Sequence, residues 1–568
     1  MKSTEMARGK SEKKIDLLRR ALALVFLGGL ILRFISFGWN TRLFGDVNLF
    51  ALTARRLAES GQLEYPMKYD FSPQAPYLTL NSPAGQHPPL WPLMAAGMAK
   101  ALNNDQTFTW LKILSFAAGV LLSGYFFLVG WRENSSSAFI ALLFVALSPW
   151  LVDYSANGSP YIAIAVLVVF GQELWRRVMA LNARWVEQAG RHELSCSDTP
   201  ALSDHSAIRE DGENLAVMVW AGMVSGAGWL LHSILWVLPI ACLGKLLLGI
   251  KAYRRDALRG LMVFGGVFLL FLVPWMLWNL KMFGRVFYSA STLYILQQLN
   301  LAEPGVFGGM VQIVPHASLG VSVLGDYLRL MAKSAYAGIR ELVQMMGPFV
   351  VVLVVVGWVE TCRISWANRK TLEQSARQNG LFLFQGFLSP LSLYLVMVLL
   401  WATYKLRFLI PLLPFLYWSA GVGFQKMIQG YGWQRGVGGL LLAGSLIWML
   451  LPYLHARSGL YYGAETPQTA YLYDQMKPLA ESLGKMPPGV VLGIANTLDG
   501  GIETIYWARQ PFVAGRGMNE VILRKLAGDF AVTYLWVDRS QEGWVRDIFP
   551  QARVLIENAA YQLYHLKP

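Results

Sequence analysis

The chain has 568 residues, of which 55% are hydrophobic and only 15% are charged, and its mean hydropathy is +0.39. This composition excludes an ordinary soluble enzyme and indicates an integral membrane protein. The formal net charge of +14 does not point to nucleic-acid binding, because lysine and arginine collect in the cytoplasmic loops of a membrane protein and set its orientation.

The first long apolar run, residues 21–37, predicts a membrane-spanning helix. A cluster of basic residues precedes it, which places the N-terminus in the cytoplasm. A signal peptide is the competing interpretation, but no small-residue cleavage site follows the run, so we expect an uncleaved anchor. Arg33 lies near the outer end of the run, where we expect its long side chain to snorkel to the interface.

Further apolar runs are also interpreted as crossings, for a total of about eleven spans. They are residues 110–130, 136–150, 161–174, 215–231, 234–250, 261–280, 347–359, 381–401, 408–424 and 437–451. The expected fold class is therefore an α-helical polytopic membrane protein. An odd number of crossings puts the C-terminal segment outside, and the basic residues of the loops fall inside in the same scheme.

The composition changes after the last apolar run. Short β-rich runs at 490–494, 531–537 and 552–556 alternate with helix-compatible stretches such as 519–526. This pattern predicts a small extracytoplasmic α/β domain, so we divide the chain into a transmembrane domain, 1–452, and a C-terminal domain, 453–568. No glycine-rich phosphate loop accompanies the strands, and nucleotide binding has little support.

An acidic residue, Asp46, follows the first span and opens a stretch in which Leu49, Leu52 and Leu57 recur near helical spacing. The stretch predicts an amphipathic helix along the membrane surface. Asp46 suits the N-cap of this helix, because aspartate is a common capping residue. A carboxylate held where the chain leaves the membrane is equally a catalytic candidate, and one residue can serve both purposes.

A second carboxylate, Asp153, follows the third span and falls on the same external face. Taken alone it is typical of an interfacial loop residue. Two carboxylates on one face suit glycosyl transfer, because that reaction needs a base to take a proton from an acceptor hydroxyl. We therefore treat Asp46 and Asp153 as candidate catalytic residues.

Three basic side chains on the same face are candidates for binding an anionic substrate. His87 lies in the motif His87-Pro88-Pro89, and Lys405 and Arg407 lie at the external end of two spans. The ordinary interpretation of the last two is snorkelling of long cationic side chains. The functional interpretation is that all three neutralise a phosphate whose charge grows as it leaves.

Several short motifs together resemble the GT-C glycosyltransferases, in particular the protein O-mannosyltransferase and lipid A aminoarabinose transferase relatives. The motifs are the external aspartate with its amphipathic helix, His87-Pro88-Pro89-Leu90, Pro274-Trp275 with Asn279 and Phe283-Gly284, and the run Arg407-Phe408-Leu409-Ile410-Pro411. The resemblance covers about the first 450 residues. It implies a polyprenyl-phosphate-linked sugar donor, an external cavity and inversion at the anomeric carbon.

By this resemblance Asp46 matches the catalytic carboxylate of the family. His87 stands where relatives often carry a lysine that touches the donor phosphate, and Val47 stands where relatives often carry a second acid. These two departures leave the donor sugar and the acceptor open.

The expected function is transfer of a sugar from a polyprenyl-phosphate-linked donor to an acceptor hydroxyl of a lipid, glycan or protein. The expected location is a bacterial-type inner (plasma) membrane with a cytoplasmic N-terminus and an extracytoplasmic C-terminal domain. No Cys/His metal cluster occurs and no cofactor is expected, while a divalent-metal requirement stays open. There are two alternatives: a transporter or flippase of lipid-linked sugars, and a noncatalytic relative that binds lipid-linked sugar. We expect membrane lipids as partners in every case and nucleic acid in none.

Overall fold

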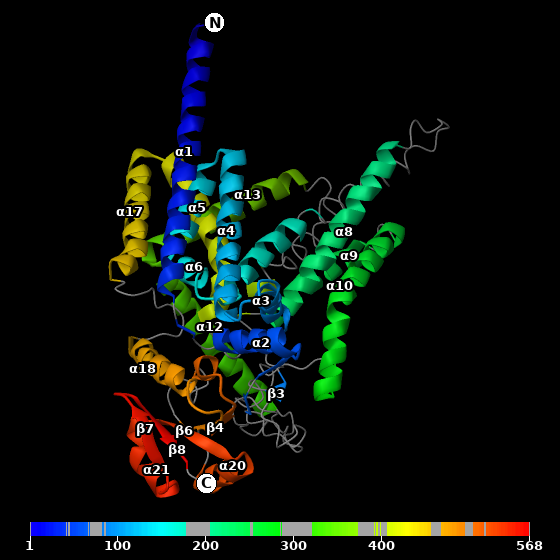
Figure 1. The fold of residues 1–568 in the computed structure, drawn as a ribbon. Helices are drawn as coiled ribbons and strands as arrows, with labels where there is room; N and C mark the ends of the chain where they lie inside the picture. The colour runs from blue at the N-terminus through cyan, green and yellow to red at the C-terminus, as the bar shows by residue number, and fades with distance from the viewer. Residues whose placement is uncertain are drawn as a thin grey trace.

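The structure is a computed structural model. It describes residues 2–40, 42–43, 46–65, 67–68, 82–83, 87–175, 177, 205–249, 254–284, 286, 321–372, 391, 393–395, 398, 406–455, 467–494, 504–515 and 519–566. The two ends of the chain lie at opposite ends of the molecule, with the long N-terminal helix at one end and a small sheet domain at the other (Figure 1).

A bundle of apolar helices forms the largest part of the fold. Its members are α1 (Lys2–Trp39), α4 (Thr107–Glu133), α5 (Ser136–Leu147), α13 (Pro348–Leu372), α16 (Leu413–Gln429) and α17 (Gly432–His455). Glycines let three of these helices approach closely: Gly357 of α13 and Gly423 of α16 face each other's helix backbones, and Gly421 lies against Ser137 of α5. Small residues at helix contacts are the usual packing device in membranes.

Five helices are long and apolar enough to cross a membrane by length and composition: Ile15–Trp39, Thr107–Glu133, Leu258–Phe283, Arg407–Gln429 and Gly432–Leu454. A sixth is added if the pair Gly325–Met346 and Pro348–Arg363, bent by 108°, counts as one span. Four other expected spans are present as shorter apolar helices: Ser136–Leu147, Tyr161–Trp175, Leu215–Leu231 and Ile234–Gly244. The chain is thus a multi-pass membrane protein, but the expected count of about eleven is not confirmed, and the run 381–401 lies almost wholly outside the described residues.

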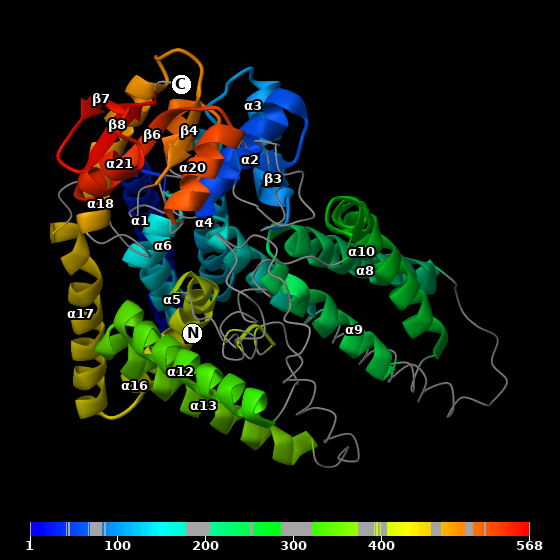
Figure 2. The ribbon, with the colours of Figure 1, turned by 90° about the horizontal axis from the view of Figure 1, so that it is seen from below.

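A second group of helices stands beside the bundle in both views (Figures 1 and 2). It contains α8 (His205–Leu231), the 3-10 turn η1 (Ser233–Trp236), α9 (Val237–Gly249) and α10 (Arg254–Phe283). On α8, a Cβ at Gly222 would lie 2.9 Å from the Phe264 carbonyl oxygen, and one at Gly226 would lie 2.7 Å from the Cβ of Phe271. Both glycines therefore serve close packing of α8 on α10, as their GxxxG spacing predicts.

The guanidinium of Arg33 does not snorkel to the interface. Its side chain is fully buried, and it donates to the carbonyl oxygens of Gly29 (3.1 Å), Ala146 (3.3 Å) and Val145 (2.9 Å). The last two carbonyls belong to the C-terminal turn of α5, where helix oxygens have no partner within the helix. Arg33 therefore ties α1 to the end of α5, because those oxygens would otherwise be unsatisfied in the bundle.

Short elements cover the bundle on the side of the sheet domain. They are α2 (Asp46–Ser60), β1 (Glu64–Tyr65), β2 (Met67–Lys68), β3 (Ser82–Pro83), α3 (Leu90–Ala101) and α6 (Pro149–Tyr154). Contrary to the expectation of a helix lying on the surface, α2 is enclosed on most sides, from Val47 to Arg55. The amphipathic helix α12 (Val321–Met346) lies on the same side and turns sharply into α13 at Gly347, whose φ of +80° suits glycine.

The C-terminal segment forms the expected small α/β domain. Its sheet has the order β2-β5-β4-β6-β8-β7; the first four strands are parallel to one another, and β8 runs antiparallel to both of its neighbours, β6 and β7. The strands are β4 (Val490–Gly493), β5 (Phe512–Ala514), β6 (Val532–Asp538), β7 (Arg553–Glu557) and β8 (Tyr561–His565). The helices are α18 (Pro467–Leu483), α20 (Glu520–Asp529) and α21 (Glu542–Ile548).

The sheet of this domain lies between two apolar layers, because alternate residues of a strand point to opposite faces. On β6, Trp536 joins the cluster that holds Tyr473 of α18, whereas Leu535 joins the cluster that holds Leu523 of α20. The β2 edge comes from the segment that follows α2, more than 400 residues earlier in the chain: Met67 pairs with Phe512, and Lys68 with Val513. The domain is therefore built from two distant parts of the sequence.

Candidate functional site

Asp46 is the first residue of α2, so its carboxylate lies in the turn where unpaired backbone N–H groups favour a negative charge. Its side chain is 11% exposed. Two neighbours on the same helix, Val47 and Asn48, are buried. The start of a helix and the packing around it thus fix the position of this acid.

Arg407 lies in the 3-10 segment η4 (Leu406–Leu412), which leads into α16. Its Nη2 is 2.7 Å from Oδ2 of Asp46, and its guanidinium carbon is 5.6 Å from the ring centre of Tyr161. The hydroxyl of Tyr394 donates to the carbonyl oxygen of Phe408 at 2.9 Å and so helps to fix η4. Arg407 is therefore a positioned cation that pairs with the candidate acid and favours its ionised form.

His87 and Tyr161 complete the surroundings of the carboxylate. Nε2 of His87 is 3.7 Å from Oδ1 of Asp46, and its ring centre is 4.9 Å from that of Phe50 on α2. The hydroxyl of Tyr161, at the start of the helix Tyr161–Trp175, donates to Oδ2 of Asp46 at 3.3 Å. Segments separated by more than 300 residues thus converge on one carboxylate.

A second histidine, His232, also lies at this site. Its Nδ1 accepts a hydrogen bond from the amide of Ile234 at 3.2 Å and so caps η1, and its ring centre is 6.2 Å from that of His87. Rings of Tyr161 and Phe408 lie 5.8 and 5.7 Å away. The sequence gives no signal for the nearness of His232 to His87 and Tyr161, because that nearness depends on how α8 packs.

Asp153 lies in α6 and is 2% exposed. Its Oδ1 accepts a hydrogen bond from Nδ2 of Asn40 at 2.9 Å, at the end of α1. Nζ of Lys112 donates to the backbone oxygen of the same Asn40 at 2.5 Å. The next residue, Tyr154, has its ring 6.0 Å from that of Tyr161, so α6 borders the site. Lys405 lies outside the described residues.

The site therefore combines one carboxyl group, one guanidinium, two imidazoles and a phenol. Within the described part of the chain, two of its buried polar atoms have no hydrogen-bond partner: Nε of Arg407 and Nε2 of His87. Unsatisfied donors of this kind suit an anionic group or a hydroxyl-rich ligand. Among the same described residues, no three His, Cys, Asp or Glu side chains lie close enough together to hold a metal ion.

No protein-family model and no curated protein matches the chain. Solved structures do match. The oligosaccharyltransferase AglB from Archaeoglobus fulgidus, in complex with an inhibitory peptide and a dolichol-phosphate, shares 15% identity with a TM-score of 0.53, over 93% of this chain and 70% of that chain. The same enzyme in its apo form gives 14% identity and a TM-score of 0.54, with coverage of 93% and 70%.

ArnT from Cupriavidus metallidurans in the apo state overlaps 96% of this chain and 97% of that chain at 11% identity, but its TM-score of 0.43 is too low to carry an argument. At the identities found, the comparisons concern the fold alone. The resemblance to GT-C glycosyltransferases inferred from the motifs is confirmed at that level. The chain therefore shares its fold with the membrane oligosaccharyltransferase AglB.

Proposed function

We propose that the protein is an integral membrane glycosyltransferase. It transfers a sugar from a polyprenyl-phosphate-linked donor to an acceptor hydroxyl on the external face, with inversion at the anomeric carbon. The observation that carries the proposal is the convergence of His87 and Arg407 on Asp46. The shared fold with AglB supports it, because that protein binds a dolichol-phosphate and a peptide in its solved complex.

In the proposed reaction Asp46 accepts the proton of the acceptor hydroxyl. The acceptor oxygen forms a bond to the anomeric carbon from one face, while the bond from that carbon to the phosphate oxygen breaks on the other, and the phosphate leaves with the electron pair. A single displacement of this kind inverts the anomeric centre. The acid needs no metal or cofactor for the proton step as written, because a positioned carboxylate is itself a general base.

Arg407 and His87 act on the leaving phosphate. Nη2 of Arg407 is paired with Oδ2 of Asp46 at 2.7 Å. The phosphodiester of the donor carries one negative charge, as the Asp46 carboxylate does, but its charge grows as the bond to the sugar breaks, and its oxygens accept bidentate hydrogen bonds from a guanidinium. Arg407 then shifts toward the leaving phosphate as that charge grows and frees an oxygen of Asp46 for the acceptor. Lys405 is proposed as a further phosphate contact, and Asp153 as a residue that helps to position the acceptor or sugar.

The location follows from the same proposal. A cytoplasmic N-terminus and an extracytoplasmic C-terminal domain put the Asp46 cluster on the external face of a bacterial-type inner membrane. The acceptor is then a lipid, glycan or protein that reaches that face. The division into a transmembrane domain, 1–452, and an external domain, 453–568, belongs to this proposal.

The alternative is a transporter or flippase of lipid-linked sugars, which would use the same cations without breaking a bond. A carboxylate beside two cations has a defined part in the transferase, because the acceptor hydroxyl must lose a proton, whereas movement of an intact donor requires no base. The two functions differ in their product: one releases polyprenyl phosphate and a glycosylated acceptor, the other moves the intact donor across the bilayer.

The deciding experiment uses the full-length protein in proteoliposomes. Polyprenyl-phosphate donors carrying different labelled sugars are supplied with an extract of envelope lipids and glycans, and both product formation and donor translocation are followed. Free polyprenyl phosphate and a labelled acceptor, absent with Asp46→Asn, are the expected result. Translocation of intact donor without any product would refute the transferase, and mass spectrometry of glycans in a deletion strain would identify the acceptor.

A further inference from the structure

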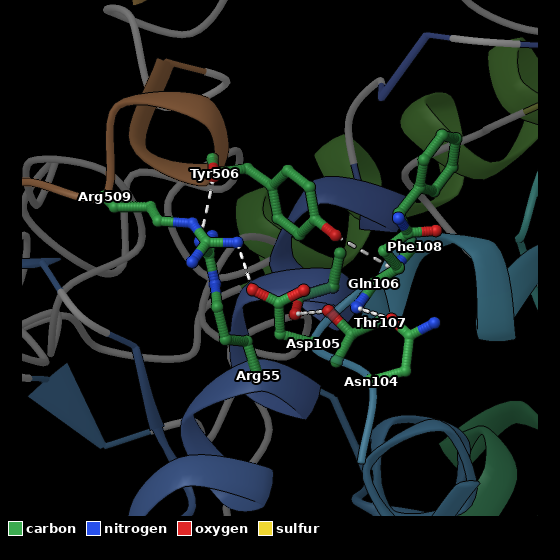
Figure 3. A network of polar contacts seen from close by, with 9 residues as sticks. Arg55, Asn104, Asp105, Gln106, Thr107, Phe108, Tyr506 and Arg509 are labelled. Carbon is green, nitrogen blue, oxygen red and sulfur yellow. Dashed lines mark hydrogen bonds and ion pairs between the residues drawn. The ribbon is translucent and has the colours of Figure 1, made fainter. Parts of the chain in front are cut away.

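The C-terminal domain holds α2 through a buried arginine that the proposed chemistry does not use. Arg55 lies near the far end of α2 and is 6% exposed. Its Nη1 donates to the backbone oxygen of Tyr506 at 2.9 Å, and its guanidinium carbon lies 4.3 Å from the centre of the Tyr506 ring. Figure 3 shows the guanidinium against this tyrosine, between α2 and the C-terminal segment.

Besides holding Arg55 of α2, Tyr506 also contacts α4. Its hydroxyl accepts a hydrogen bond from the amide of Phe108 at 3.1 Å, in the first turn of α4, where helix N–H groups need an external partner. The neighbouring Thr107 donates from its hydroxyl to the carbonyl oxygen of Ala51 on α2 at 2.9 Å. Thus α2, α4 and the C-terminal domain are joined in a closed ring of contacts (Figure 3).

The same C-terminal segment also holds the chain that follows α2. Tyr506 lies six residues before Phe512, and β5 pairs with β2 at Met67 and Lys68. An exposed ion pair, Arg509 with Asp105, borders the ring and adds a contact to the turn before α4. The segment 504–514 therefore fixes both α2 and the strand that leads toward His87.

The geometry of α2 connects this contact to the candidate site. Nine residues separate Asp46 from Arg55, which corresponds to about 13 Å along a helix and a rotation of about 180°. The contacts of Asp46 therefore hold one end and one face of α2. The contact of Arg55 with Tyr506 holds the opposite face, nearer the other end of the helix. A roll of α2 by about 20° would move a side chain about 6 Å from the helix axis by roughly 2 Å.

We propose that Arg55 is a positioning residue for the transfer reaction: with Tyr506 it locks α2 to the C-terminal domain and so sets the place of Asp46. The inference rests on the proposed function, and it assigns the C-terminal domain a part in placing Asp46. A displacement of about 1 Å at reacting groups is enough for a loss of around 10²-fold. Arg55 itself stays charged, although burial lowers the pKa of its guanidinium from the usual value.

The test compares Arg55→Met with Arg56→Met in full-length protein in nanodiscs. Arg56 is the adjacent arginine of the same helix, and its described partners, Gln62 and Glu64, are local. We expect Arg55→Met to lower kcat by about 10- to 100-fold with little change in donor KM, since it disturbs the acid and not the phosphate cations. Arg56→Met should behave as wild type.

Hydrogen exchange of the α2 peptide gives a readout that needs no activity. Arg55→Met should raise exchange through to the Asp46 end, while α16 and α17 keep their protection. The milder Arg55→Lys and Tyr506→Phe, which each keep part of the contact, should fall between wild type and Arg55→Met in both measurements and remain informative if Arg55→Met folds poorly.

The outcomes separate this inference from the proposed function. Wild-type transfer, measured first, tests the function itself. Reduced kcat together with faster α2 exchange supports the positioning role. Equal kcat for Arg55→Met and Arg56→Met, or unchanged exchange at the Asp46 end, overturns it even if the enzyme is active. Faster exchange over the whole protein with unchanged kcat per folded molecule would also overturn it, because Arg55 would then stabilise the fold only.

Discussion

Replacing Asp46 with asparagine separates its charge from its shape. At an effective dielectric constant of about 20, unit charges about 3 Å apart attract by roughly 5 to 6 kcal/mol, most of which desolvation cancels. The side chain of Asp46 is 11% exposed, and that of its partner Arg407 is 21% exposed. Removal of one partner should therefore lower the free energy of unfolding by about 2 kcal/mol, the low end of the range for buried charge pairs.

The effect of Asp46→Asn on transfer should be larger than its effect on stability. Loss of a general base typically lowers a rate by about 10² to 10⁴, or roughly 3 to 5 kcal/mol in the activation barrier. Transfer is measured with saturating donor in proteoliposomes and normalised to folded protein. The matched control is Asp474→Asn, because Asp474 also pairs with an arginine, Arg42, at 2.7 Å, but is largely exposed; its transfer should equal wild type.

A double variant tests whether Asp46 is a mere counter-ion. Asp46→Asn combined with Arg407→Gln removes the stranded positive charge and should recover stability without recovering transfer. Asp46 is not the base if Asp46→Asn transfers sugar at the wild-type rate. It is also not the base if the double variant regains activity, since Asp46 would then serve only to neutralise Arg407.

Three further outcomes are expected. Arg407→Ala should raise donor KM by about 10- to 100-fold through loss of a charge-assisted phosphate contact; an unchanged KM in a donor titration would mean that Arg407 serves Asp46 alone. Gly423→Val should lower the free energy of unfolding by about 1 to 3 kcal/mol, because its Cβ would meet the Leu353 backbone oxygen. In the matched Gly439→Val nothing lies within 4 Å of the added Cβ, and valine has a higher helix propensity than glycine, so this variant should be as stable as wild type or slightly more stable. Equal thermal stability of the two variants would contradict the packing account. Reporter fusions at the two chain ends should report a cytoplasmic N-terminus and an external C-terminus; a cytoplasmic signal at the C-terminus would end the external-domain proposal.

Much of the fold can be predicted from local sequence, because the signals are local. The runs at 490–494, 531–537 and 552–556 correspond to β4, β6 and β7, and Asn519 caps α20 at the expected place. Strands β2, β5 and β8 were missed. Of these, β2 and β5 are only two and three residues long, and nothing near them in sequence indicates which strand they join.

The missed contacts of the site have the same cause. The leucine spacing after Asp46 predicts a helix along the membrane surface, whereas Arg55 of this helix is buried against the distant Tyr506. Arg33 was expected to reach the interface because the sequence does not reveal that the end of α5 stands beside it. By contrast, the candidacy of Asp46, His87 and Arg407 came from their place outside the spans and from family motifs, and their catalytic and binding roles stay predictions.

The pairing of β2 with β5 has a consequence for biosynthesis. Residue 67 leaves the ribosome early, whereas its partner at 512 is made only near the end of translation. Contacts so far apart in the chain form late. The helices can insert one after another, and α2 can pack against α3 and α4 early, but β2 and Arg55 must wait for nearly the whole polypeptide before their partners exist. A chain that terminates before residue 504 would thus enter the membrane with Asp46 present and without Tyr506, the partner of Arg55 on the same helix.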